Sequence, residues 1–221
     1  MITTGIKKLD KLLGGGFPAR TVVLVSGGPG SGKTLFALKF LMDGVMKKEK
    51  CCYVSLNETR EELIRACKGI ETLSEAEKYV GKNFAIEHIP LGENITMKKF
   101  IDIIASYPKI DRLVIDNVNK LLIFAENDRS YRVHLSELVR SLKSMGCTLL
   151  ICETRGENTD TGNGESFECD GVLSLSFLEL EEKPMRTMTV HKMRYANFEP
   201  KIPYEFVIDE KDLKLAETKI I

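Results

Sequence analysis

Residues 21–34 read TVVLVSGGPGSGKT, and this stretch decides the fold. Its first six residues are a largely apolar, β-branched run, and residues 27–34 satisfy the pattern G-x-x-x-x-G-K-[ST]. Apolar residues then recur at the i, i+3, i+4, i+7 spacing of a helix: Leu38, Leu41, Met42 and Val45. A strand, a glycine-rich loop and a helix in this order are the context in which such a loop surrounds phosphate groups. The sequence therefore predicts a nucleoside triphosphate site on an α/β domain.

The residue types of the loop match the chemistry of phosphate binding. Glycines let successive backbone N–H groups turn inward, and the helix that follows presents its N-terminal donors and the positive end of its dipole. Lys33 supplies a charge for the β- and γ-phosphates, and the Thr34 hydroxyl is a ligand for Mg²⁺. The expected ligands are thus ATP or ADP with Mg²⁺. The residues predicted to contact the nucleotide are Gly28, Pro29, Gly30, Ser31, Gly32, Lys33, Thr34 and Leu35.

The order of strands and helices predicts the architecture. Short apolar strands alternate with helical segments over the first two thirds of the chain, which is typical of a mostly parallel sheet with helices on both faces. Strands are expected at residues 21–26, 51–56, 84–89, 112–115 and 148–152. An antiparallel C-terminal extension of the sheet is expected at residues 172–179, 187–192 and 204–208. Because no linker composition separates the two parts, residues 1–221 are expected to form a single α/β domain.

The strand at residues 112–115 runs directly into Asp116. A carboxylate at the carboxyl end of a buried strand can hold Mg²⁺ and its water shell. Asp116 follows the loop by about eighty residues with two strands between, so its strand can lie close to the phosphate loop. Thr34 and Asp116 are therefore the predicted metal ligands, and Lys33 and Asp116 are predicted catalytic residues.

The composition excludes several classes of protein. Of 221 residues, 43% are hydrophobic, and 32 Lys and Arg balance 32 Asp and Glu, so the formal net charge is zero. Such a balance argues against a strongly basic nucleic-acid binder. The six cysteines include no C-x-x-C pair, which argues against a thiol-disulfide oxidoreductase and a zinc ribbon. No run of eighteen apolar residues and no signal peptide are visible, so we expect a cytoplasmic protein without a membrane-spanning segment.

Several stretches of the sequence are similar to a known family. TGIKKLD at residues 4–10 and LGGGFP at 13–18 resemble its N-terminal element, and the phosphate loop follows at the family's usual interval. CYVSLNET at residues 52–59 resembles its second strand, and HKMR at 191–194 its late K-x-R element. On these residues, nearly the whole chain resembles the KaiC-like branch of the RecA superfamily of P-loop ATPases. The resemblance implies a RecA-like core, ATP hydrolysis, and assembly into rings with active sites between subunits.

The family carries one or two glutamates just after the second strand, and one of them polarises the water that attacks the γ-phosphate. Here the pair reads Asn57-Glu58. An asparagine can orient water but cannot take its proton. Two interpretations follow: Glu58 acts as the catalytic base, or hydrolysis is slow and nucleotide occupancy is the signal.

Lys192 and Arg194 map onto the element that in the family reaches across to the γ-phosphate of the neighbouring subunit. Positive charge supplied in this way stabilises the transferring phosphoryl group. The resemblance therefore implies that both are catalytic residues of a homo-oligomer. From the residues alone, the two cations also fit a second interpretation, in which they are solvated on an exposed edge strand or deter pairing there. Tyr195 stands where the family usually has a glycine, which leaves the local loop geometry open.

Three classes of function remain open. The first is an ATPase that works as a ring-forming motor or timer, and the second is a nucleotide switch that changes its affinity for an unidentified protein partner. The third is a recombinase-like filament on DNA. Residues 153–170 argue against the third class, because Arg155 is their one basic residue among six acidic ones and an acidic loop repels phosphate. We expect slow hydrolysis of Mg·ATP and a regulatory role in a homo-oligomer such as a hexameric ring, with no nucleic acid and no membrane as partners.

Overall fold

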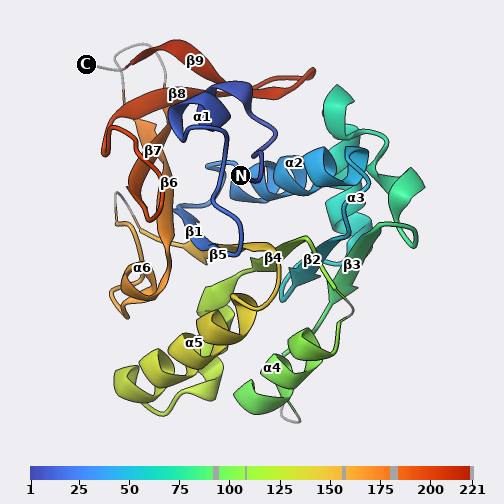
Figure 1. Ribbon diagram of the computed structural model, residues 1–221, viewed down its shortest axis with the longest axis vertical. Helices are drawn as coiled ribbons and strands as arrows, with labels where there is room; N and C mark the ends of the chain where they lie inside the picture. Colours follow the sequence, from blue (N-terminus) through green and yellow to red (C-terminus); the bar gives the residue numbers. More distant parts are fainter. Residues whose placement is uncertain (92–94, 108, 156–157, 180–183, 220–221) are drawn as a thin grey trace.

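The computed structural model describes residues 1–91, 95–107, 109–155, 158–179 and 184–219. Over these residues nine strands form one sheet in the order β3-β2-β4-β5-β1-β6-β7-β8-β9 (Figure 1). The strands are β1 (Val22–Gly27), β2 (Cys51–Ser55), β3 (Phe84–His88), β4 (Arg112–Asp116), β5 (Cys147–Glu153), β6 (Gly171–Leu178), β7 (Met185–Met193), β8 (Pro203–Ile208) and β9 (Leu213–Lys219). The helices are α1 (Lys7–Leu12), α2 (Lys33–Met46), α3 (Arg60–Lys68), α4 (Met97–Ser106), α5 (Asp128–Leu142) and α6 (Glu165–Glu168), with 3₁₀ turns η1 (Glu71–Leu73), η2 (Ala76–Tyr79) and η3 (Val118–Phe124).

The sheet has a parallel part and an antiparallel part. Strands β3, β2, β4, β5, β1 and β6 run parallel to one another, and β6 to β9 continue the sheet with antiparallel pairs. This confirms the predicted mostly parallel α/β fold with its C-terminal antiparallel extension. The parallel strands β1, β2, β4 and β5 end at the same edge of the sheet, where ligands bind in folds of this kind.

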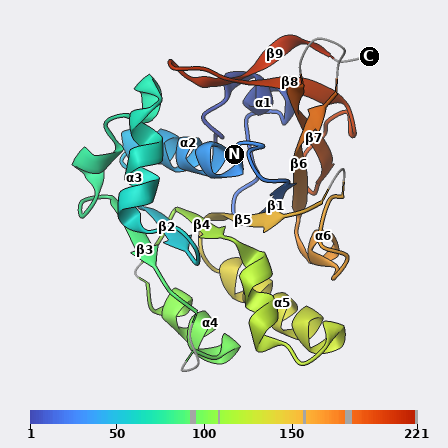
Figure 2. The same cartoon turned by 180° about the vertical axis from the view of Figure 1, so that it is seen from behind.

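Alternate residues of each strand point to opposite faces of the sheet. Tyr53 and Val114 belong to one hydrophobic core, which α2 and α3 cover. Cys52 and Leu113 belong to a second core, which α4 and α5 cover. Figures 1 and 2 show these two pairs of helices on opposite sides of the sheet. Because both faces are covered, the inner strands are buried along their whole length and read as continuous apolar runs.

Local signals fix where the helices begin. Thr59 caps α3 by accepting from the Glu62 backbone N–H, and Glu62 accepts from the Thr59 backbone N–H in return, which completes a capping box. Thr96 caps α4 by accepting from the Lys99 backbone N–H.

Three features differ from the sequence prediction. Neither α1 nor β9 was expected, because a six-residue helix and a polar last strand give weak periodic signals. The two pack against each other at one end of the sheet. Strand β7 is an inner strand between β6 and β8, and the edges of the described sheet are β3 and β9. The expectation of an edge strand is wrong for β7 as a whole, but β7 pairs with β8 only at Thr187, Met188 and Thr189, so the sheet order does not decide the interpretation of Lys192 and Arg194.

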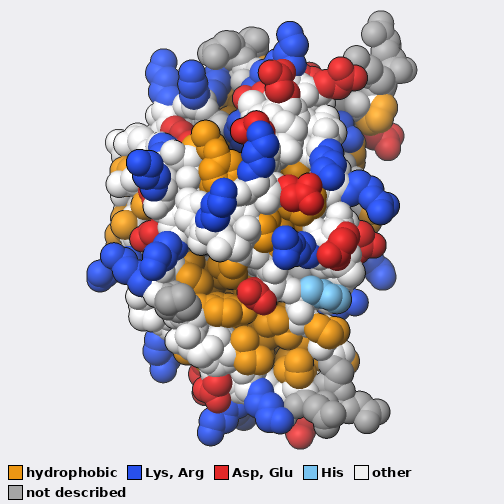
Figure 3. Space-filling model, turned by 90° about the vertical axis from the view of Figure 1, so that its right-hand side faces the viewer, with side chains coloured by type: hydrophobic (Ala, Val, Ile, Leu, Met, Phe, Trp, Pro, Cys, Tyr) orange, Lys and Arg blue, Asp and Glu red, His pale blue; other side chains and the backbone are white. Residues whose placement is uncertain are grey.

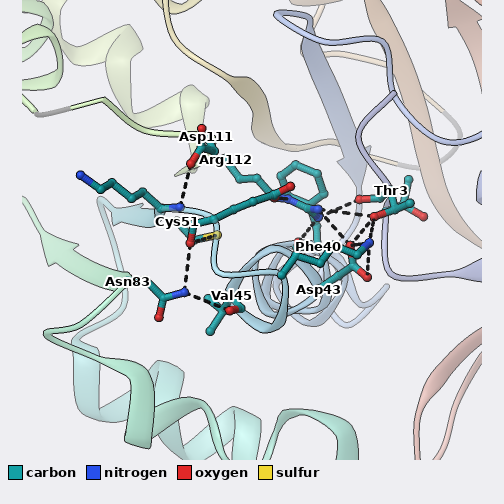
Figure 4. A network of polar contacts seen from close by, with 12 residues as sticks. Thr3, Phe40, Asp43, Val45, Cys51, Asn83, Asp111 and Arg112 are labelled. Atoms are coloured by element: carbon teal, nitrogen blue, oxygen red, sulfur yellow. Dashed lines mark hydrogen bonds and ion pairs between the residues drawn. The ribbon is translucent and has the colours of Figure 1, made fainter.

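A buried arginine fixes the amino end of β4 (Figure 4). Arg112 is fully buried, and one of its Nη atoms donates to the carbonyl oxygens of Thr3 and Phe40, each at 2.7 Å. Its guanidinium also pairs with Asp43 at 3.0 Å and with Glu49 at 2.5 Å. The cation is thus compensated by two carboxylates and two carbonyls, which buried charges require.

The same arginine explains why a glycine, Gly44, lies in the last turn of α2. A Cβ on Gly44 would lie 2.5 Å from the Nε atom of Arg112. The guanidinium also lies over the Phe40 ring, 4.9 Å from its centroid. The C-terminal half of α2, the N-terminal segment and β4 are therefore joined through one side chain.

Candidate functional site

The phosphate loop joins β1 to α2, and its shape depends on glycine at two points. A Cβ on Gly27 would lie 2.2 Å from the carbonyl oxygen of Leu175 on the neighbouring strand β6. Gly32, the N-cap of α2, has a φ of +101°, which side chains rarely adopt. Glycine at these two positions therefore lets the loop pass close to β6 and then turn into the first turn of α2.

Lys33 lies against its own loop in this structure. Its Nζ atom donates to the Gly28 carbonyl at 2.7 Å, and the Ser31 hydroxyl donates to the same oxygen at 2.8 Å. Burial lowers the pKa of Lys33, although the nearby carboxylates of Glu153 and Asp116 act in the opposite direction. A phosphate oxygen is a stronger partner than a carbonyl for this cation, so the lysine is available to transfer to a ligand.

Thr34 and Asp116 meet at the predicted metal position. The Thr34 hydroxyl donates to Asp116 Oδ2 at 3.3 Å, across 82 residues of sequence. Burial raises the pKa of Asp116, opposed by hydrogen bonds from Tyr53 and Thr34 and by the charge of Lys33. Among the described residues no group of three or more His, Cys, Asp and Glu could hold a metal. One carboxylate with one hydroxyl fits Mg²⁺, which fills its remaining positions with water and phosphate oxygens.

Tyr53 is a member of the site that sequence reasoning missed. Its side chain is fully buried on β2, and its hydroxyl donates to Asp116 Oδ2 at 2.5 Å. Burial and the adjacent Asp116 charge raise the pKa of Tyr53 well above its usual range, so the phenol keeps its proton. The sequence holds a signal only if the strand pairing is known: Tyr53 lies opposite Val114, which makes it the diagonal neighbour of Asp116 on the same face.

Asn57 and Glu58, in the turn after β2, differ in their burial. The Ser55 hydroxyl accepts from the backbone N–H groups of Glu58 at 2.8 Å and Asn57 at 3.3 Å, which holds the turn. Asn57 is exposed, whereas Glu58 is half-buried. Burial raises the pKa of Glu58, and the charges of Asp116 and then Glu62 add to the effect. Glu58 therefore interacts electrostatically with the carboxylate at the predicted metal position.

Arg186 also contacts the phosphate loop and was not singled out by the sequence. It lies at the start of β7, and its Nε atom donates to the Gly30 carbonyl at 3.2 Å. Its guanidinium lies over the ring of Phe177, 5.3 Å from the centroid. The two residues of this contact are 156 positions apart, so no local spacing could reveal it. The loop thus has a second cation from the same chain beside Lys33.

The sequence of the whole chain also matches a known protein family. A family model described as "ATPase: KaiC" matches residues 2–220. The chain belongs to the KaiC family. This confirms the resemblance read from the motifs, and the RecA-like α/β fold with it. The KaiC family is a family of ATPases, so membership implies nucleotide binding.

Individual KaiC-family relatives cover most of the chain. A UPF0273 protein of Pyrococcus horikoshii is 29% identical over 211 residues, which span 87% of this chain and 85% of the relative. The circadian clock protein KaiC2 of Synechocystis is 30% identical over 226 residues, but these span 96% of this chain and 39% of that longer protein. The crystal structure of a KaiC-like protein from Pyrococcus horikoshii superposes with a TM-score of 0.85 at 30% identity, covering 97% of this chain and 98% of that one.

In this KaiC-family chain the K-x-R element does not reach its own phosphate loop. Gly27, at the loop, pairs with Leu175 on β6, whereas Met193 pairs with Gly171 at the opposite end of that strand. Lys192 and Arg194 flank Met193 and therefore lie at the amino ends of the parallel strands. The structure brings Lys33, Thr34, Glu58 and Asp116 together and leaves Lys192 and Arg194 apart from them.

Both cations have partners within the chain. The Lys192 Nζ atom donates to the carbonyl oxygens at the end of α6, those of Ser166 at 3.1 Å, Phe167 at 3.3 Å and Cys169 at 2.6 Å. Arg194 pairs with the buried Asp170 at 3.4 Å. Lys192 and Arg194 are thus held on one surface beside α6.

The acidic character of residues 153–170 is weaker than the sequence suggests. Asp170 is buried and pairs with Lys143 as well as Arg194. Glu165 is also buried and accepts from the Tyr131 hydroxyl. Neither carboxylate is available to repel a phosphate, and Glu157, part of the same prediction, lies outside the described residues.

The molecular face at the β3 edge carries charged side chains of both signs (Figure 3). Lys and Arg side chains are interspersed with Asp and Glu over this face, and hydrophobic side chains gather in its lower half. A nucleic-acid backbone requires a continuous basic surface, and this face does not offer one. Among the described residues, the helices are too short or too polar to cross a bilayer.

Proposed function

We propose that this chain binds Mg·ATP in the loop of residues 27–34 and hydrolyses it slowly, in a homo-oligomer with a regulatory role. The observation that carries the proposal is that Asp116 lies against the phosphate loop: it accepts from the Thr34 hydroxyl across 82 residues of sequence, and its charge acts on the adjacent Lys33. Membership of an ATPase family supports it.

Each residue has a role that its chemistry supports. The backbone N–H groups of the loop and the Lys33 ammonium bind the β- and γ-phosphates. Thr34 and Asp116 would hold Mg²⁺, which neutralises charge on the phosphate oxygens. Glu58 accepts the proton of the attacking water, because it is the carboxylate after β2 that is coupled to Asp116.

A second copy of the chain completes the site in this proposal. Lys192 and Arg194 lie at the far end of β6 and β7 from their own loop, so a phosphate they contact belongs to another subunit. Two exposed aromatic residues adjoin them: Tyr195, with 79% of its surface accessible, follows Arg194 in sequence, and Phe167, with 78%, accepts from Lys192 through its carbonyl oxygen. Large exposed apolar groups around a cation pair support a protein interface on this surface.

A nucleotide switch with little hydrolysis is the alternative function. Asn57 occupies the first position after β2, where it is exposed and has no acidic group to offer. If Glu58 does not act as a base, ATP remains bound and its occupancy alone alters affinity for a protein partner.

Steady-state phosphate release with Mg·ATP, measured over a range of protein concentrations, tests the proposal. For the wild type we expect activity that rises more than linearly with protein concentration, because the site is completed between subunits. Glu58→Gln should lower turnover by about a hundredfold, the lower end of the usual range for loss of a general base, with ATP affinity unchanged. Lys33→Ala should abolish ATP binding, whereas Lys39→Ala, on the same helix but paired with Asp212, should retain it. Wild-type activity in Lys33→Ala would refute the site, and tight ATP binding with no release, indifferent to Glu58→Gln, would select the switch.

A further inference from the structure

Tyr53 presents an isolated polar group at the base of the metal position. Its ring packs in the core between the sheet and α2, and its hydroxyl reaches Asp116 Oδ2 at 2.5 Å. A phenylalanine would fill the same volume without a hydroxyl to satisfy, and burying an unbonded hydroxyl is costly. The hydrogen bond to Asp116 therefore offsets the cost of burying this hydroxyl.

The two hydroxyls around Asp116 act on the same oxygen. Tyr53 donates to Oδ2 at 2.5 Å, and Thr34 donates to Oδ2 at 3.3 Å. Both of these hydrogen bonds, from described residues, reach Oδ2 and neither reaches Oδ1. Tyr53 and Thr34 come from β2 and α2, so they fix the carboxylate from two independent elements.

We propose that Tyr53 is a positioning residue for the Mg²⁺ site: together with Thr34, its phenol holds the Asp116 carboxylate in the orientation in which it would bind the metal or its water shell. The inference rests on the proposed Mg·ATP function. A carboxylate that has to be reoriented before it binds a metal loses affinity, and outer partners of metal ligands typically contribute ten- to a hundredfold.

A matched pair of substitutions tests this role. Tyr53→Phe and Tyr131→Phe each remove one buried hydroxyl that donates to a carboxylate, Asp116 in the first case and Glu165 in the second. Binding of a fluorescent ATP analogue is titrated with Mg²⁺, and the affinity in EDTA is measured beside it. We expect Tyr53→Phe to raise the half-saturating Mg²⁺ concentration by about tenfold, the lower end of that range, without changing the affinity in EDTA. Tyr131→Phe should leave both quantities at the wild-type value.

A double substitution separates positioning from a general loss of stability. In an Asp116→Asn background, Tyr53→Phe should produce no further change in Mg²⁺ dependence, because the group that it positions is already gone. Thermal unfolding of each variant gives the fraction folded. Equal Mg²⁺ dependence in Tyr53→Phe and Tyr131→Phe, or an added loss in the Asp116→Asn background, would overturn the inference. A wild type that binds no nucleotide would instead refute the proposed function.

Discussion

Strand β4 carries a buried charge at each end, and the two are treated differently. Arg112, at the amino end, is compensated by Asp43 and Glu49 and by two backbone carbonyls. Asp116, about 13 Å away at the carboxyl end, receives hydrogen bonds from two hydroxyls, and no side-chain cation is bonded to it among the described residues. Burial accordingly raises the pKa of Asp116.

This difference in compensation distinguishes a charge that stabilises the fold from one that is available to a ligand. A buried ion whose compensation is complete within the chain contributes to the fold, and its removal leaves other charges unpaired. A buried carboxylate that is held only by neutral donors keeps an unmet demand for positive charge. The first belongs to Arg112 and the second to Asp116, although both lie on one five-residue strand.

The largest expected effect comes from the amino end. Arg112→Ala should lower the free energy of unfolding by about 3–5 kcal/mol, because it removes the partner of Glu49 and of two backbone carbonyls and leaves Asp43 with Lys47 as its one ion-pair partner among the described residues. Urea unfolding measures the loss. Lys68→Ala is the control, since Lys68 and Glu77 form an exposed pair of the kind that contributes about 0–1 kcal/mol. If the two variants were equally stable, the Arg112 cluster would not be structural.

The carboxyl end should respond in the opposite direction. A folded-state pKa above the unfolded value means that ionised Asp116 opposes folding near pH 7. Asp116→Asn removes that charge and keeps an acceptor for Tyr53, so the melting temperature should stay equal or rise. Mg²⁺-dependent binding of an ATP analogue should weaken by about tenfold or more, because Asn is a poor ligand for a hard cation. A lower melting temperature with unchanged Mg²⁺ dependence would mean that Asp116, like Arg112, stabilises the fold and does not bind the metal.

The smallest effect concerns how carboxylates at this end influence one another. Phosphate release should increase with pH through the raised pKa of Glu58, since a base acts only when deprotonated. Glu62→Gln removes one charge that raises this pKa but preserves the α3 capping box, because glutamine serves there as well. The acid limb of the pH–rate profile should therefore move to lower pH. Glu61→Gln, in the same turn of α3, is the control, and an equal displacement in both variants would exclude a specific effect of Glu62.

Much of the fold and part of the site could be predicted because their signals are local. The apolar strands, the Thr59 capping box and the phosphate loop each lie within a short window of sequence. Asp116 could be found because it ends a recognisable strand. Such features depend on backbone preference and on strand or helix periodicity, both of which the sequence displays directly.

The remaining features depend on which strands become neighbours. The roles of Tyr53 and Arg186 follow from pairings across 63 and 156 residues, and the Arg112 cluster joins segments 109 residues apart. Sheet order also places β7 between β6 and β8, which no local pattern of its residues reveals. These contacts produce no periodic pattern in the sequence, because each involves a single pair of residues far apart in the chain.

Helix α2 is held to β4 at both of its ends. Its first turn contacts Asp116 through Thr34, and its later turns hold Arg112 through Phe40 and Asp43. The helix and the strand thus form a closed frame about 20 Å long, with the phosphate loop at one corner. Neither member can open without breaking contacts at both ends. Their amides should therefore exchange with solvent deuterium as one cooperative unit, so that a nucleotide bound at the loop slows exchange as far away as Gly44.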